Sequence, residues 1–428
     1  MDLTILLGSF ALLMIIGIPV AFCFLTSAII YMWSSDLPLA MTAQQMSSGV
    51  RGYTLVAIPL YVLAGELMNS GGITRRIFDF ANAMVGHVKG GLGHVNVVAS
   101  VIFAGASGSS SADAAGLGRI EIKSMLDKGY RPEFAASITA VSSTIGPIIP
   151  PSIHLVLYGA LAEVGIDYLF LAGIVPGFIM AACMMAMIYF LVVTGREPCP
   201  TQPKASPRER LRYFGRAIFP ASAPVIIVGG ILSGIFTPTE AGAVAVGYAL
   251  ILGLIYGDLT LASLKEAMVR SVKSTAMVMF ILATAKVFAL GITLEQVPEL
   301  LAVALFSLTE NVTVLILLVL IALLILGTFE SASANLVIVT PVLLPMAPSL
   351  GLDPVHMGVV VVLALMIGVI TPPVGISLFI VSDIAGVSFG KVVRNVLPYI
   401  FALIVALLLV TFLPDLVLFL PRVFGYAG

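Results

Sequence analysis

Apolar segments of twenty residues or more recur along this chain, and they constrain its fold more than any other feature. Clear examples are residues 5–32, 168–194 and 396–420. As helices they are long enough to cross about 30 Å of hydrocarbon. Hydrophobic residues make up 60% of the chain and charged residues 10%, against roughly 25% charged in soluble domains. The sequence therefore predicts an all-α polytopic membrane protein that is embedded in the lipid bilayer.

Several function classes find no support in the sequence. The net charge of −1 gives no positive electrostatic field that would attract nucleic acid, and the sequence contains no phosphate-binding P-loop motif. The three cysteines and four histidines show neither pairing nor metal-ligand spacing. The N-terminus lacks the basic region and cleavage site of a signal peptide, so it reads as a retained first span. We therefore expect no nucleic-acid partner, no catalytic residues and no organic cofactor.

Lysine and arginine are placed unevenly, and their loops set the orientation of a membrane protein. They gather in residues 119–131, 196–216, 265–273 and 391–394, whereas nothing between Lys286 and Lys391 is basic. We expect the basic stretches to be cytoplasmic loops, with 196–216 as a linker that divides the chain. This arrangement predicts the N-terminus inside and the C-terminus outside, with Arg51 as a single exception in an outer loop.

The chain contains an internal repeat. Residues 105–113 read GASGSSSAD and residues 327–335 read GTFESASAN, an offset of 222 (335 − 113). The offset holds without a gap for GYRP at 129–132 against GLDP at 351–354. It also holds for GPIIPPS at 146–152 against GVITPPV at 368–374. The first serine motif precedes a basic turn and the second an acidic one, so the repeats are inverted, as in many secondary transporters.

Each serine motif lies between two arms too short to span the bilayer. The first arms are residues 93–104 and 114–125, and each is about 18 Å long at 1.5 Å per residue. The simplest shape is a helical hairpin that enters halfway and turns back. The second hairpin is expected from residues 312–326 and 334–348, entering from the opposite side.

A span broken by a double proline follows each hairpin. The expected breaks are residues 146–152 and 368–373, because proline removes a donor and clashes with the preceding turn. The freed carbonyls and nearby hydroxyls are hard oxygen ligands that suit sodium, and half-helix N-termini could face a carboxylate. Serine and alanine also serve close helix packing. Asp113 could either cap a helix or act as a functional acid, and the sequence leaves both roles open. Glu330 is the stronger candidate for coupling transport to a cation or for contacting the substrate.

These motifs together resemble the large membrane subunit, of the DctM type, of tripartite ATP-independent periplasmic (TRAP) transporters. The resemblance rests on GPIIPPS, GIFTPTEAGAVAV (234–246), TPVLLPMAPSLGLDPVHMGVV (340–360) and IGVITPPVG (367–375). It implies an elevator-type fold of the ion-transporter superfamily, with two re-entrant hairpins and two broken helices. It also implies sodium-driven uptake of a carboxylate solute, such as a dicarboxylate, a sugar acid or sialic acid, across a bacterial inner membrane. The implied partners are a periplasmic substrate-binding protein and a small four-helix membrane subunit, expected as a separate chain.

The resemblance also assigns residues. The first sodium site would use Gly105, Ser107, Ser109, Ser110, Gly146 and Pro150; the second would use Gly327, Ser331, Ser333, Gly368, Thr371 and Gly375. The substrate would contact Ser107, Ser152, Glu330 and Ser331. Many family members carry an acid at the position of Ser331, whereas here Glu330 stands one residue earlier.

The expected organisation follows the repeat. Scaffold and arm helices occupy 1–90 and 217–311; the transport domain occupies 91–167 and 312–389; further scaffold helices occupy 168–195 and 390–428; the linker is 196–216. Two alternatives stay open at this point. One is a stand-alone sodium- or proton-coupled carboxylate carrier, and the other is a membrane scaffold or membrane-embedded enzyme.

Overall fold

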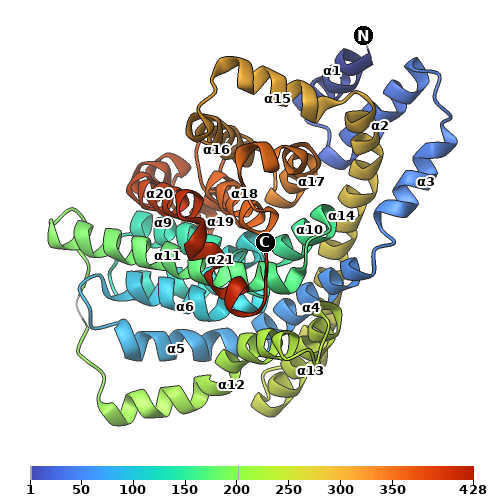
Figure 1. Cartoon of the computed structure of the whole chain (residues 1–428). Helices are drawn as coiled ribbons and strands as arrows, with labels where there is room; N and C mark the ends of the chain where they lie inside the picture. Colours follow the sequence, from blue (N-terminus) through green and yellow to red (C-terminus); the bar gives the residue numbers. More distant parts are fainter. Residues whose placement is uncertain (1, 201) are drawn as a thin grey trace.

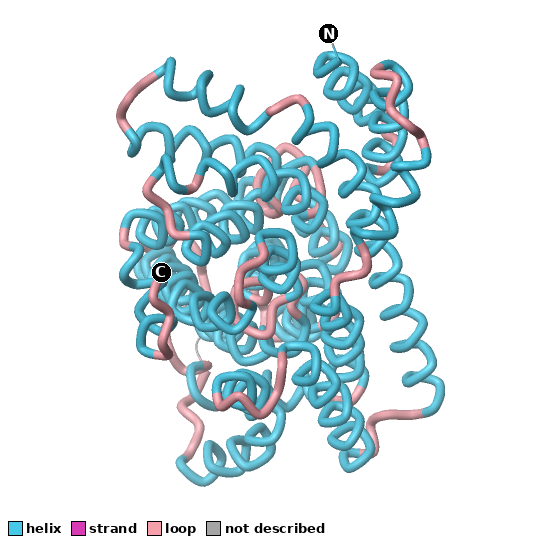
Figure 2. Tube along the Cα trace, turned by 45° about the vertical axis from the view of Figure 1, so that its right-hand side comes forward, coloured by secondary structure: helices cyan, strands magenta, loops and turns pink. Residues whose placement is uncertain are grey.

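The computed structural model describes residues 2–200 and 202–428, excluding the side chains of residues 2, 105–107 and 112. Every regular element in this part of the chain is a helix (Figure 2). Six helices are long and apolar enough to cross a membrane, and a bent pair raises the number to seven. The expectation of an all-α, multi-pass membrane protein is confirmed in this coarse form.

One group of helices is built on the long helix α14 (Leu261–Leu294). Its other members are α1 (Asp2–Ile15), α2 (Val20–Ser34), α3 (Ala40–Gly49), η1 (Tyr53–Val56), α4 (Ala57–Ser70), α5 (Ile73–Val85), α12 (Pro207–Leu232) and α13 (Pro238–Tyr256). Helices α2, α3 and α4 pack directly against α14, α13 packs on α4, and α12 packs on both α13 and α5. In Figure 1, α2, α3 and α14 of this group lie on the right, whereas α5 and α12 lie lower and to the left.

A second group contains both serine motifs and both double-proline motifs. From the first half come α6 (Gly91–Ser107), α7 (Ser110–Ala115), α8 (Leu117–Asp127), α9 (Pro132–Ser142), η2 (Ser143–Ile145), α10 (Ile153–Ala162) and α11 (Ile166–Val193). From the second half come α15 (Val297–Leu308), α16 (Val312–Phe329), α17 (Ala332–Leu343), η3 (Leu344–Met346), η4 (Pro348–Leu350), α18 (Pro354–Gly368), α19 (Ile376–Ala385), α20 (Phe389–Phe412) and α21 (Pro414–Val423).

Prolines and capping residues determine where several of these helices begin. Pro132 and Pro354, equivalent in the repeat, each occupy the first turn of a helix, where the missing N–H has no intrahelical partner to lose. Ser206 and Thr237 cap α12 and α13 in reciprocal capping boxes with a glutamate three residues on. Local residue chemistry therefore explains where the half-length and full-length helices begin.

Two sequence expectations fail in the scaffold region. Residues 5–32 form two helices that pack against each other, because Gly17 adopts φ +86° and Pro19 precedes α2. The basic residues at 265–273, expected in a loop, lie inside α14. Most residues of the other basic stretches expected in loops likewise lie in helices, at the starts of α8, α12 and α20. A cluster of basic residues occurs both in loops and in the first turns of a helix that begins before its apolar segment. The positions of the charges alone therefore did not distinguish the two.

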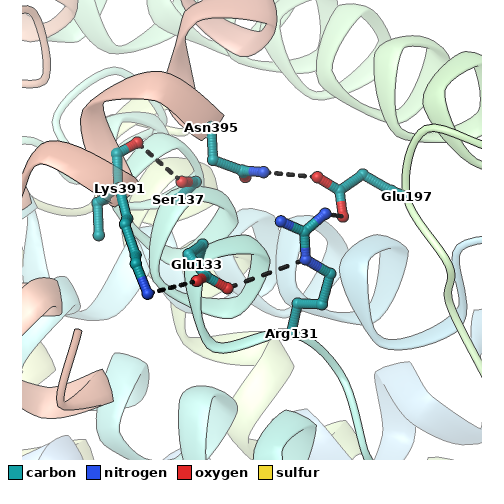
Figure 3. A network of polar contacts seen from close by, with 7 residues as sticks. Arg131, Glu133, Ser137, Glu197, Lys391 and Asn395 are labelled. Carbon is teal, nitrogen blue, oxygen red and sulfur yellow. Dashed lines mark hydrogen bonds and ion pairs between the residues drawn. The ribbon is translucent and has the colours of Figure 1, made fainter. Parts of the chain in front are cut away.

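A polar network ties the central linker to the second group of helices (Figure 3). Glu197, at the start of the linker, pairs with Arg131 at 3.4 Å and accepts a hydrogen bond from Asn395 of α20 at 2.5 Å. Glu133 lies 3.9 Å from Arg131 and 3.7 Å from Lys391. The network joins α9, α20 and the linker at one end of the molecule.

The packing of α11 and α20 bears on the expected domain boundaries. α20 packs against α9, α11, α18 and α19, all of which belong to the second group, and α11 packs against α6, α10, α18 and α20. These contacts favour grouping residues 168–195 and 390–428 with the transport domain, whereas the sequence suggested a scaffold role. The remaining boundaries stay predictions.

Candidate functional site

The first serine motif turns tightly against the first helix break. α6 ends at Ser107 and α7 begins at Ser110, with Gly108 between them at φ +59°. A Cβ on Gly108 would lie 3.0 Å from the backbone nitrogen of Ile153 and 3.1 Å from the carbonyl oxygen of Pro151. Glycine is therefore required here by both its conformation and the close approach of the break.

The second serine motif approaches the second break more closely still. Gly327 and Gly368 pack backbone to backbone, and a Cβ on Gly368 would lie 2.5 Å from the Cα of Gly327. The backbone N–H of Gly375 donates to the carbonyl oxygen of Thr328 at 3.3 Å. Each tip thus contacts the break that follows it in the same repeat.

The two halves are also linked crosswise at the tips. The Ser110 hydroxyl lies 2.9 Å from that of Ser143 in its own half and 3.2 Å from that of Ser377 in the other half. Correspondingly, α7 packs against α19, and α17 packs against α10. The tip and break motifs therefore form one interlocked structure, and the repeat alone did not predict these crossed contacts.

His154 makes the second crossed link. Its Nδ1 lies 3.3 Å from the carbonyl oxygen of Gly108 and its Nε2 lies 3.2 Å from the Ser333 hydroxyl. Since a carbonyl only accepts, Nδ1 carries the proton in the neutral ring and the Ser333 hydroxyl donates to Nε2. Donation in this direction leaves the lone pairs of the Ser333 oxygen available to another ligand.

A central cavity of about 160 Å³ lies where these elements meet. Four helices begin at its wall, namely α7, α10, α17 and α19. Helices α4 and α14 of the first group close the other side. The described polar side chains that line it are those of Glu66, Asn69, Ser109, Ser110, Ser111, His154, Ser274, Ser331 and Ser333.

Of the residues expected in the first sodium site, Ser109 and Ser110 line the central cavity. Ser110 is buried between both halves, and Ser109 lies 3.3 Å from Ser111, hydroxyl to hydroxyl. Gly146 and Pro150 lie buried in the break. The side chains of Gly105 and Ser107 fall outside the described part of the structure, so their roles stay predictions.

The residues expected in the second sodium site lie at the other tip and break. Ser331 caps α17 and accepts from the N–H of Ala334 at 3.4 Å, while Ser333 reaches His154. Thr371 donates to the carbonyl oxygen of Ile367 at 2.7 Å, which leaves its oxygen free to accept or ligate. Hydroxyls and break carbonyls of this kind are ligands for a hard cation. The described residues hold no group of three or more His, Cys, Asp or Glu side chains that could bind a metal ion.

Two residues expected at the substrate have other contacts here. The Ser152 hydroxyl is fully buried: it caps α10 by accepting from Leu155 at 3.1 Å and donates to the carbonyl oxygen of Pro147. Glu330 is half-buried, accepts from the backbone N–H of Ser331 at 3.3 Å, and lies outside the lining of the central cavity. Their substrate contacts stay predictions.

The repeat-related pair Asp113 and Asn335 occupy different roles. Asn335 donates to the carbonyl oxygens of Leu326 and Glu330 at 3.0 and 3.3 Å, and so holds the second tip closed. Asp113 is buried inside α7 and does not start a helix, so the capping alternative is wrong. His154, Ser143 and Ser377 were missed as site residues, because only the three-dimensional crossing brings them to the tips.

Comparison with known proteins identifies the family. Residues 7–416 match the model of the "Tripartite ATP-independent periplasmic transporter, DctM component". The chain belongs to this family. It is therefore the large membrane permease component of a TRAP transporter and not an enzyme, as the sequence motifs predicted.

Characterised relatives of this DctM-family chain span nearly its whole length. The sialic acid TRAP transporter large permease SiaM of Vibrio cholerae is 44% identical over 97% of both chains. The C4-dicarboxylate large permease DctM of Pseudomonas aeruginosa is 42% identical over 87% of both. The sialic acid permease SiaT of Haemophilus influenzae is 37% identical, and the match covers 96% of this chain but 67% of SiaT.

The fold is similar to that of a solved transporter. The crystal structure of the Alcanivorax borkumensis YdaH transporter superposes with a TM-score of 0.64 over 88% of this chain and 89% of YdaH, at 17% identity. At this identity the likeness establishes the fold alone.

Proposed function

We propose that this permease imports a carboxylate-bearing solute, driven by a sodium gradient, through an elevator movement. The observation that carries the proposal is the convergence of helix starts on the central cavity. Three helices of at least ten residues, α10, α17 and α19, begin there. Each N-terminus presents the positive end of its helix dipole, which favours an anion, although Ser152 and Ser331 already pair one first-turn N–H group each in α10 and α17.

The side chains that line the cavity are consistent with a bound anion whose charge is stabilised mainly by backbone N–H groups. Its only ionisable lining residues in the described chain are Glu66 and His154. Glu66 lies 3.1 Å from Arg270, so its charge is compensated. Serine hydroxyls and Asn69 could bind the hydroxyl groups of a sugar acid. The names of the relatives support sialic acid and C4-dicarboxylates as the first solutes to test.

Sodium coupling is proposed from the tips and breaks. Ser110, Ser333 and Thr371 place hydroxyl oxygens beside unwound backbone in each half. Sodium prefers such oxygen ligands, and binding there would tie each hairpin tip to its break. Cations bound on both sides of the cavity would also offset the charge of the solute.

The elevator movement is proposed from the packing. The hairpins, broken helices, α11 and α20 form one body, and α4, α5 and α14 present the surface along which it would move. We place the protein in a bacterial inner membrane, with the basic segments and the N-terminus on the cytoplasmic side and the C-terminus on the outer side. A small membrane subunit is proposed as a partner because the match leaves about a third of SiaT uncovered, and the family description supports a periplasmic binding protein.

The test is uptake by proteoliposomes that contain this chain and its small subunit. We expect sialic acid or succinate uptake only with an inward sodium gradient and an added binding protein. Uptake by this chain alone would support the stand-alone carrier, and uptake without sodium would contradict the coupling.

A further inference from the structure

A second cavity, larger than the central one, lies further along α14, which lines both cavities together with α10 and α17. Its volume is about 510 Å³, within the range of small-molecule sites. Helices α3 and α14 form one wall, and α10 and α17 form the other. Its polar lining residues are Gln45, Ser48, Thr54, Glu163, Lys286 and Thr293.

Lys286 is the only basic side chain of this lining. It lies within the membrane-spanning helix α14, and its Cβ packs against Gly49 of α3, where a Cβ would come within 2.9 Å. The side chain is nonetheless exposed, and no described carboxylate lies within 4 Å of its ammonium group. An ionisable residue at this depth is costly unless it serves a water-filled path or a ligand.

The position of Lys286 places it on the proposed route of the solute. Ser274 and Val278 of α14 line the central cavity, and Leu282 and Lys286 line the second one. Each of these residues lies about one turn beyond the last, and the series winds by about 40° per step, so it connects the two cavities along α14 while turning around the helix. Twelve residues (286 − 274) separate the ends of the series, which corresponds to about 18 Å along α14.

We propose that the second cavity is an entry site for the solute, in which the Lys286 ammonium group binds its carboxylate. The inference rests on the proposed import of carboxylates and adds a binding site ahead of the hairpin tips. Hydroxyl and amide groups of Ser48, Thr54 and Gln45 would bind the uncharged part of the solute. Glu163 at the rim accepts hydrogen bonds from hydroxyl groups, so the site fits a hydroxylated monocarboxylate better than a dicarboxylate.

The kinetic test replaces Lys286 in the complete transporter complex. Lys286→Gln should raise the KM for solute-loaded binding protein about tenfold, the loss expected for one charge-assisted hydrogen bond, with a smaller change in kcat. Lys286→Arg should restore most of the loss because it keeps the charge. Lys273→Gln is the matched control, since Lys273 is an exposed lysine of the same helix outside both cavities.

A labelling test separates this site from the central one. Thr293→Cys is introduced into a chain whose three native cysteines are replaced, and its modification by an impermeant thiol reagent is followed. Sialic acid should slow the labelling, whereas N-acetylmannosamine, which lacks the carboxylate, should not. The protection should disappear in Lys286→Gln and persist in Ser333→Ala.

The outcomes distinguish the inference from the proposed function. If the wild-type complex transports carboxylates but Lys286→Gln keeps its KM and its protection, the entry site is refuted and the import function stands. If no carboxylate is transported by the wild-type complex, the proposed function itself fails.

Discussion

The close backbone approach of Gly368 to Gly327 gives a sharp test of the second sodium site. In Gly368→Ala the new Cβ would lie 2.5 Å from the Gly327 Cα, 2.8 Å from the Gly327 carbonyl carbon and 2.9 Å from the Leu324 carbonyl oxygen. All three atoms belong to the backbone, so no side chain can rotate away. Relief to an ordinary contact of about 3.4 Å requires the tip and break to separate by about 0.9 Å (3.4 − 2.5).

The size of the effect follows from this displacement. Overpacking of this kind typically costs about 1–3 kcal/mol, and metal-ligand distances tolerate only about 0.2 Å. If this free-energy cost reduces the affinity for sodium, the sodium concentration for half-maximal uptake should rise about 5- to 150-fold.

The assay is initial solute uptake by proteoliposomes over a sodium titration. Gly247→Ala in α13 is the control, because a Cβ there meets nothing within 4 Å, and its sodium dependence should equal that of the wild type. An unchanged sodium dependence in Gly368→Ala, at normal expression, would refute the role assigned to the contact.

Further predictions concern the crossed link and the linker. His154→Ala should lower uptake at least tenfold because both tip contacts are lost, and His154→Asn should recover part of it, in the same uptake assay. Burial, and then the nearby Glu197 carboxylate, raise the pKa of the Cys199 thiol in the linker to about 12. Maleimide labelling of Cys199 should therefore be slow at pH 8 and keep rising with pH beyond 9, and Glu197→Gln should speed it. Glu197→Ala should also destabilise the protein by about 1 kcal/mol, measured as a lower Tm, because Asn395 loses its hydrogen-bond acceptor, whereas the half-exposed Arg131 keeps Glu133 beside it.

Much of the site could be predicted because its local chemistry is explicit in the sequence. Double prolines cannot continue a helix, so the breaks at 146–152 and near 368–375 follow from residue type alone. The serine motifs, repeated at a fixed offset, likewise marked both tips. The expectation of arms too short to span a bilayer agrees with α6 and α17 within a few residues and fails for α16 (Val312–Phe329), which is long and apolar enough to cross a membrane. The remaining arm is divided into α7 and α8.

The unpredicted features depend on tertiary packing. Nothing in the sequence near His154 indicates that its ring would join Gly108 to Ser333, since these groups lie in three separate elements. The split of residues 5–32 depends on one glycine and one proline within an otherwise continuous apolar run. Lys286 gave no periodic or motif signal, and its significance depends on the cavity that α3, α10 and α17 form around it.

The central claim is that sodium is held between each hairpin tip and its break. Its most direct test is the Tm of the purified complex in sodium chloride against choline chloride, for the wild type, Ser110→Ala, Gly368→Ala and the double variant. Bound sodium stabilises the folded protein according to its affinity, so each single variant should lose part of the sodium-specific rise in Tm and the double variant should lose all of it. A double variant that keeps the full sodium-specific rise would contradict the account.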